Sequence, residues 1–230
     1  MTIKLSRRGF LSASASAGFI ALHPFSANAS ATQAHLRIME TTDLHVHVFP
    51  YDYYADKERD TVGLARTASI VKDIRAEATN SLLVDNGDFL QGAAVCDLAA
   101  EGLLPDQSIH PVIQAMNALE YDAVGLGNHE FDYGIPTLSQ ALSGARFPVL
   151  SSNTEMPDAP WGRDLLLDIR ASDEAGQFHD LKIGIISLLP PMLEDWNHSI
   201  VAGKIKVSGF KDIAEQHVEN LKRDGADLVI

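Results

Sequence analysis

Short apolar runs, each bounded by polar or small residues, recur along the chain and have the length of buried β-strands. Between several of them the apolar residues follow helical spacing instead. Leu64, Ala68 and Val71, for example, fall on one face of a helix that starts near Gly63. The predicted strands cover residues 36–43, 81–88, 121–128, 147–153, 181–189 and 226–230, and the predicted helices begin near residues 63, 111, 135 and 210.

Strands that alternate with helices indicate an α/β layered fold. Segment 164–180, which contains a glycine turn, is predicted to form a hairpin arm. His217 lies on the apolar stripe of the last helix, and we interpret it as a packed histidine. Ligands of open α/β sheets bind beyond the carboxyl ends of the strands, so the residues that follow each strand are the candidates for chemistry.

Composition excludes several kinds of protein. Apolar residues make up 46% of the chain and charged residues 21%, as in a globular protein with a core. No run of about 18 apolar residues occurs, so we predict no membrane span. The net charge of −13 disfavours binding to a nucleic-acid polymer. Cys96 is the only cysteine, which excludes an internal disulfide and favours a small buried side chain.

Residues 1–31 have the organisation of a twin-arginine export signal. Arg7 and Arg8 precede an apolar stretch of small residues, and ANASA (27–31) has the small residues that a signal peptidase accepts. We expect export by the twin-arginine machinery, cleavage and a periplasmic location. Cleavage would leave 15 basic and 31 acidic residues, a charge of −16, so a phosphate substrate would need local positive charge, for which a bound metal is the obvious source.

The first predicted strand ends in TTDLHVH, which contains Asp43 and His45. Residues two apart point to the same side of an extended chain, and a carboxylate beside an imidazole suits a transition metal. The second predicted strand ends in DNGDFLQG, where Gly87 permits a sharp turn that leaves Asp88 at the strand tip. Asp85 fits a structural role. Each motif alone fits ordinary hydrogen bonding or turn formation equally well.

The third predicted strand ends in GNHEFD, residues 127–132. The amide oxygen of Asn128 can bind a metal as a neutral ligand. His129 can act as a general acid or donate to a developing oxyanion, and Asp132 is placed to orient that imidazole. Such a concentration of polar groups at a strand end is hard to explain by structure alone.

The order D-x-H, then GD, then GNHE, each after a strand, resembles the calcineurin-like metallophosphoesterases. Within that family, LRIMETTDLH, YDYY, GLARTASIVKDIR and LLVDNGDFLQG are similar to the periplasmic 2′,3′-cyclic-nucleotide 2′-phosphodiesterase/3′-nucleotidase group, more than to the related 5′-nucleotidases. The resemblance runs from about Leu36 to Ile230. It implies an α/β fold with a layered αββα sandwich.

The resemblance also implies a dinuclear site and a nucleotide substrate. Asp43 and His45 would hold one divalent cation, Asp88 would bridge two, and Asn128 would hold the second. Manganese, zinc, cobalt and iron are all plausible. The cations would clamp the phosphate and activate a hydroxide. His129, paired with Asp132, would assist at the leaving oxygen, and Asn128 and His129 would contact the substrate.

The family uses further metal-binding histidines and a carboxyl-terminal nucleotide-binding domain, and the sequence contains neither. We therefore expect residues 32–230 to be an incomplete amino-terminal metallophosphoesterase domain, truncated after its first part. We expect it to have little or no activity alone, because its metal site would lack ligands.

Three alternatives stay open at this point. The chain could be a non-catalytic exported fragment that binds metal weakly, or a 5′-nucleotidase of the same family. HVH (45–47) also fits the H-x-H of an amidohydrolase or of the polymerase-and-histidinol-phosphatase group, but that reading explains neither DNGD nor GNHEFD.

Overall fold

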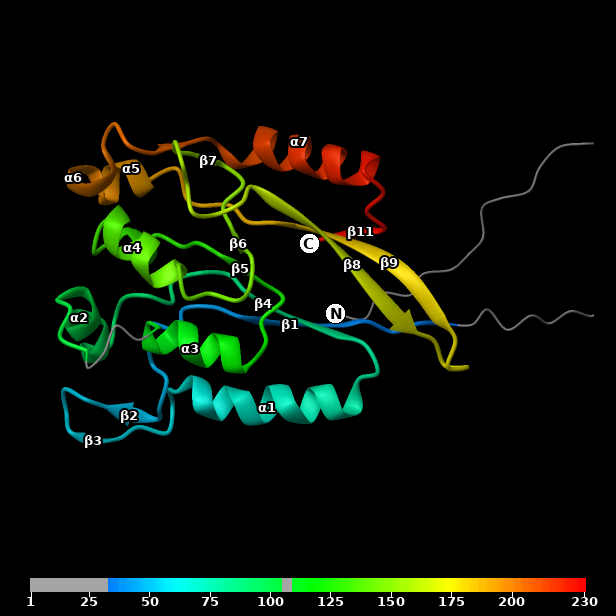
Figure 1. The fold of residues 1–230 in the computed structure, drawn as a ribbon, viewed down its shortest axis with the longest axis horizontal. Coiled ribbons are helices and arrows are strands. Elements are labelled where there is room, and N and C mark those ends of the chain that lie inside the picture. The colour runs from blue at the N-terminus through cyan, green and yellow to red at the C-terminus, as the bar shows by residue number, and fades with distance from the viewer. Residues whose placement is uncertain (1–32, 105–108) are drawn as a thin grey trace, which may run out of the picture.

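The computed structural model describes residues 33–104 and 109–230, and the predicted export signal at 1–31 lies outside this part (Figure 1). The helices are α1 (Leu64–Glu77), α2 (Ala94–Ala100), α3 (Pro111–Ala118), α4 (Ile135–Leu142), α5 (Leu193–Trp196), α6 (His198–Val201) and α7 (Phe210–Arg223), with a 3₁₀ turn η1 (His129–Phe131). The strands are β1 (Arg37–Thr41), β2 (Tyr51–Asp52), β3 (Lys57–Glu58), β4 (Ser81–Asp85), β5 (Ala123–Gly125), β6 (Val149–Leu150), β7 (Thr154–Glu155), β8 (Asp164–Ser172), β9 (Phe178–Ile186), β10 (Lys206–Val207) and β11 (Leu228–Val229).

Four strands form a parallel sheet in the order β1-β4-β5-β6. The register pairs Thr41 with Asp85, and Asp85 with Val124, so the strands that precede the three motifs end nearly level. Because all four strands are parallel, their carboxyl ends share one edge, on the left in Figure 1. The sheet therefore brings the three polar motifs to one place.

A second sheet, in the order β11-β9-β8, lies against the first. Leu82, Ala123 and Leu150 of the parallel sheet pack with Ile183 and Ile185 of β9 to form the core between the two sheets. A larger core lies between the parallel sheet and its helices, and α7 covers the outer face of the second sheet (Figure 1). This is the α/β layered fold predicted from the strand and helix pattern, in the αββα arrangement that the resemblance implies.

The predicted helices and the strand alternation are confirmed, but the predicted strands at 36–43, 81–88, 121–128 and 147–153 are shorter than expected, because their polar ends lie in the loops that follow β1, β4, β5 and β6. One predicted boundary is also wrong in kind. The predicted strand 181–189 and the second arm of the predicted hairpin are a single strand, β9. Its first half alternates between exposed and partly buried residues because it extends past the core, and its second half is buried. One strand thus has two hydrophobic patterns, which the sequence presents as two elements.

Two single-residue interpretations are also confirmed. Cys96 is buried with a free thiol. His217 is 7% exposed, and its Nδ1 lies 2.6 Å from Asp164 Oδ2, so it joins α7 to the start of β8. None of the helices in the described part of the chain is both long and apolar enough to cross a membrane.

Candidate metal centre

The loops after β1, β4 and β5 hold all six residues singled out in the sequence. Backbone hydrogen bonds tie the first loop to the second: the N–H of Asp43 donates to the carbonyl of Gly87, and the N–H of His45 donates to the carbonyl of Asp88, both at 3.0 Å. The third loop joins them through side chains, as described below. The three motifs are therefore neighbours in space although they are far apart in the sequence.

His45 is oriented as a ligand. Its Nδ1 lies 2.5 Å from the carbonyl oxygen of Gln91, which can only accept, so Nδ1 carries the proton. Nε2 is then left with a lone pair, and it lies 3.6 Å from Oδ1 of Asp43. A backbone carbonyl that fixes the tautomer in this way is the usual partner of a metal-binding histidine. Thr42 donates to the other oxygen of Asp43 at 2.6 Å.

The prediction that Asp43 and His45 share one side of an extended chain is wrong, because β1 ends at Thr41 and the backbone is left-handed at three of the four candidate ligands. The φ angles are +53° at Asp43, +46° at His45 and +60° at Asp88. Residues with a Cβ adopt this region at a cost of order 1–3 kcal/mol each, and such residues cluster at functional sites. Gly92 helps to make room here, because a Cβ at this position would lie 2.6 Å from the Cβ of His45.

Asp88 links the second loop to the third. Its Oδ1 accepts the backbone N–H of His129 at 2.9 Å. Gly127 lies directly beneath that carboxylate, since a Cβ there would fall 2.2 Å from the same Oδ1. Asn128 caps η1 with its backbone while its side chain makes no capping hydrogen bond, so its amide oxygen remains available.

His129 is held by Asp132 at 2.7 Å between Nδ1 and Oδ2. Asn197 donates to the other oxygen of Asp132 at 2.7 Å, which fixes the carboxylate. Burial alone would lower the pKa of His129, but the hydrogen bond to Asp132 and the nearby carboxylates of Asp88, Asp132 and Glu130 outweigh it, so the pKa is raised. The ring of His129 meets the ring of His45 edge to face, with centroids 5.1 Å apart.

Two buried carboxylates support these loops. Asp85 accepts from Thr41 at 2.6 Å and from the N–H of Gly87 at 2.9 Å, and burial raises its pKa to about 7 despite those donors. Its structural interpretation is thereby supported. Glu130, the fourth residue of GNHEFD, received no role from the sequence, yet it is 1% exposed and lies beneath the second and third loops. Burial raises its pKa, and backbone N–H groups act in the opposite direction.

The chemical types of the donor atoms in these loops suit a divalent cation. The donor set contains an imidazole with a free Nε2 beside a carboxylate, a second carboxylate on the adjoining loop and a free amide oxygen. In residues 33–104 and 109–230, however, no three His, Cys, Asp or Glu side chains are gathered closely enough to form a metal cage. The fit therefore rests on the Asp43–His45 pair with Asp88 and Asn128 around it.

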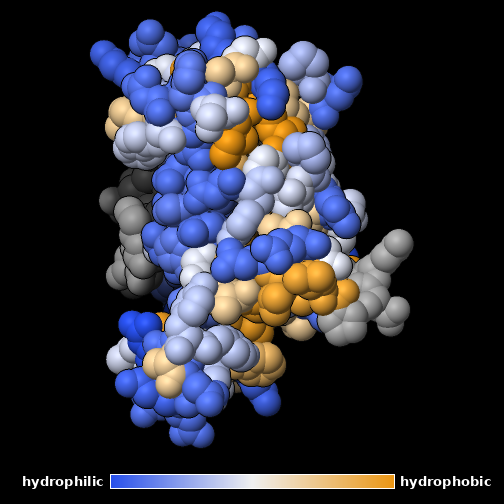
Figure 2. All heavy atoms as spheres, turned by 90° about the vertical axis from the view of Figure 1, so that its left-hand side faces the viewer, coloured by the Kyte–Doolittle hydropathy of each residue, from blue (hydrophilic) through white to orange (hydrophobic). Residues whose placement is uncertain are grey.

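The surface around this end of the molecule is mixed in character. Figure 2 shows this end of the molecule, where apolar side chains interrupt the polar surface. Leu98 on α2 is 45% exposed and Leu103 after it is 62% exposed.

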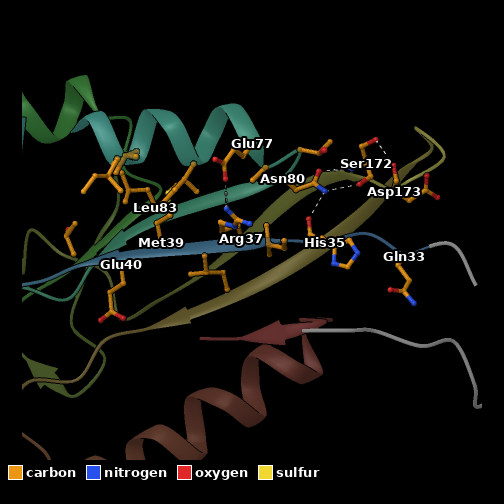
Figure 3. Close-up of a pocket in the computed structure, with 18 of the residues that line it drawn as sticks. Gln33, His35, Arg37, Met39, Glu40, Glu77, Asn80, Leu83, Ser172 and Asp173 are labelled. Carbon is orange, nitrogen blue, oxygen red and sulfur yellow. Dashed lines mark hydrogen bonds and ion pairs between the residues drawn. The ribbon is translucent and has the colours of Figure 1, made fainter. Parts of the chain in front are cut away.

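A groove of about 570 Å³ lies elsewhere, along β1 between α1 and the turn of the β8–β9 hairpin (Figure 3). It holds none of the six candidate residues, and Asn80 spans it by donating to the carbonyls of His35 and Ser172.

Comparison with known proteins gives a consistent result. The family model for the calcineurin-like phosphoesterase matches residues 36–230. The chain is 41% identical over 208 residues to a 2′,3′-cyclic-nucleotide 2′-phosphodiesterase/3′-nucleotidase of Yersinia enterocolitica, which covers 88% of this chain and 31% of that protein. The chain thus spans about a third of the length of that relative.

Solved structures show the same fold. The calcineurin-like phosphoesterase YfkN of Bacillus subtilis superposes with a TM-score of 0.80 at 36% identity, covering 85% of this chain and 60% of that one. A putative 5′-nucleotidase of Staphylococcus aureus superposes with a TM-score of 0.70 at 26% identity, covering 84% of this chain and 36% of that one.

Proposed function

Because the chain belongs to the calcineurin-like phosphoesterase family, we propose that it carries the amino-terminal catalytic residues of a metal-dependent hydrolase of 2′,3′-cyclic nucleotides and 3′-nucleotides. The observation that carries the proposal is the convergence of the loops after β1, β4 and β5, with Nε2 of His45 free and 3.6 Å from Oδ1 of Asp43. The choice of substrate rests on similarity, which is higher to the Yersinia cyclic phosphodiesterase than to the staphylococcal nucleotidase.

In this proposal Asp43, His45, Asp88 and Asn128 hold two divalent cations, with manganese, zinc, cobalt and iron as the candidates. When bound, the cations would neutralise the phosphate and lower the pKa of an attacking water. They would also supply the local positive charge that a chain of net charge −13 otherwise lacks.

The residues of the third loop handle the proton and the substrate. The Asp132 carboxylate keeps the proton of His129 on Nδ1, which leaves Nε2 as the ring nitrogen available to a substrate. With its pKa raised, His129 is protonated over a wider pH range and can donate from Nε2 to a phosphate oxygen or to the leaving alkoxide. The amide of Asn128, next to it in the chain, can contact the same phosphate.

The test is hydrolysis, with and without Mn²⁺, by a form of the protein in which these residues are accompanied by the further metal-binding histidines expected from the family. For that form we expect Mn²⁺-dependent release of product from 2′,3′-cyclic AMP and 3′-AMP in preference to 5′-AMP, and loss of the activity in EDTA, whereas residues 32–230 alone should show little or no turnover. A preference for 5′-AMP would favour a 5′-nucleotidase instead.

A second candidate is a non-catalytic metal-binding domain exported by the twin-arginine machinery. It is favoured by the lack of a three-residue His/Cys/Asp/Glu cage within the described residues. It predicts cation-dependent stabilisation of the fold without hydrolysis of any nucleotide. For either candidate, a periplasmic location is tested by fusing residues 1–31 to a reporter and changing Arg7 and Arg8 to lysine, which should stop twin-arginine export.

A further inference from the structure

Glu130 is a buried carboxylate whose partners are all backbone groups. Its Oε2 accepts the N–H groups of Asp88 at 2.8 Å and Gly127 at 2.6 Å. Its Oε1 accepts the N–H groups of Phe89 at 2.7 Å and Leu90 at 3.0 Å. Within residues 33–104 and 109–230 no lysine, arginine or histidine forms an ion pair with it, so the four N–H dipoles balance its charge.

These four donors come from two different loops. Three of them belong to consecutive residues of the loop after β4, beginning with Asp88, and the fourth precedes Asn128 in the loop after β5. Asp88 in turn accepts the N–H of His129. Glu130 is thus held by three N–H groups of the other loop and one of its own, and Asp88 by one N–H group of the loop that carries Glu130.

The reciprocal bonds constrain a strained segment. Asp88 has a φ of +60°, a conformation that other contacts must maintain. The side chains of Phe89 and Leu90 are buried, so the segment is anchored on its core side as well. Glu130 is the group that fixes the backbone of this segment against the loop that carries Asn128 and His129.

We propose that Glu130 is a positioning residue for the metal and phosphate site: it sets the distance between Asp88 and the Asn128–His129 pair without contacting metal or substrate. The expected effect of Glu130 on metal affinity rests on the proposed function. Its role in holding the two loops together does not depend on any ligand. Partners that orient metal ligands typically change metal affinity by about 10–100-fold when they are altered.

The test is Glu130→Gln, which keeps the shape but puts an NH₂ donor against two of the four N–H groups. A matched control is Asp122→Asn, because Asp122 also accepts a backbone N–H from β4, that of Leu83 at 2.7 Å, away from the loops. We expect Glu130→Gln to weaken Mn²⁺ binding by about 10–100-fold in electron paramagnetic resonance titrations and Asp122→Asn to change it less than about twofold.

A second readout needs no metal. In the metal-free chain we expect the amide hydrogen of His129 to exchange at least about tenfold faster in Glu130→Gln, while the β4 amides keep their protection. That amide donates to Oδ1 of Asp88 and not to Glu130, so its faster exchange would report a loosened junction between the two loops. Should Glu130→Gln fail to fold, Glu130→Asp, which is too short to reach both loops, replaces it with the same expectations.

Unchanged exchange at His129 in a folded variant would overturn the inference, as would equal losses of Mn²⁺ affinity in Glu130→Gln and Asp122→Asn. Failure of the unmodified chain to bind Mn²⁺ would count against the proposed function alone, because the exchange measurement decides the positioning role separately.

Discussion

Oδ1 of Asp88 accepts the backbone N–H of His129 at 2.9 Å, across a sequence separation of 41 residues. The bond joins a candidate metal ligand directly to the residue expected to transfer a proton. The two groups therefore cannot move independently, and a change that displaces one will be measurable at the other.

Gly127→Ala tests how tightly this junction is packed. The new Cβ would lie 2.2 Å from Oδ1 of Asp88 and 2.7 Å from its backbone nitrogen, so the carboxylate must move. We expect calorimetric Mn²⁺ affinity to fall at least about tenfold and unfolding free energy to fall by about 1–3 kcal/mol, as for other overpacked sites. The control is Gly209→Ala, where nothing lies within 4 Å of the added Cβ. Normal Mn²⁺ binding by Gly127→Ala would contradict the geometry.

Asn128→Ala and His129→Ala should separate binding from turnover. The first removes a proposed ligand, so metal content measured by mass spectrometry should fall. The second removes the proposed proton donor, so turnover should fall by about 10²–10⁴-fold while metal content stays unchanged. Metal content and turnover should both be measured on a form of the protein that hydrolyses the substrate at a measurable rate. Full activity in both variants would show that these residues have been assigned wrongly.

Asp132→Asn should lower the pKa of His129. The carboxylate is the main group that raises this pKa against the opposing effect of burial, and an amide cannot replace its charge. Chemical-shift titration of the histidine rings in metal-free buffer measures the change, with the signals of the other histidines as internal controls. An unchanged His129 pKa would mean that the 2.7 Å contact does not form in solution.

Asp85 should make stability depend on pH. Its pKa is raised by burial to about 7, above the value of 3.8 for an exposed side chain. The neutral acid thus stabilises the fold fully below about pH 4, and this contribution disappears as pH rises to about 7. Relative to the unmodified chain, Asp85→Asn should gain about 3 kcal/mol of unfolding free energy between pH 5 and pH 8. Urea unfolding in EDTA at both pH values measures it, and an equal difference at both would refute the burial argument.

The fold could be predicted from the sequence because the hydrophobic periodicity and the positions of the polar motifs indicate the same order of strands and helices. Helices such as α1 and α7 present long apolar stripes, and the motif residues follow strands that prove to be parallel neighbours. Several short elements were not predicted. The helix α2 has seven residues, and β2, β3, β7 and β10 have two each, which is too short for a hydrophobic period to be recognised. The strands β6 and β11 are equally short but were predicted, because each lies within a longer apolar run.

Within the site, the sequence identified side chains that carry chemistry but not those that act through the backbone. Asp43, His45, Asp88 and His129 have residue types that point to metals or protons. Glu130 works by accepting backbone N–H groups, which every residue except proline has, so its partners leave no pattern in the sequence. The left-handed backbone at Asp43 and His45 could not be predicted from the sequence either, because it is imposed by contacts with the loop after β4.

The register of the parallel sheet has a consequence for how the chain matures. Thr41 faces Asp85, and Asp85 faces Val124, so the level strand ends depend on correct pairing along β4. A slip of one residue would displace a loop by about 3.3 Å and turn its side chains to the opposite face. A mispaired chain would lack the level strand ends that bring the candidate ligands together, so under the proposed function Mn²⁺ binding would report on correct strand pairing.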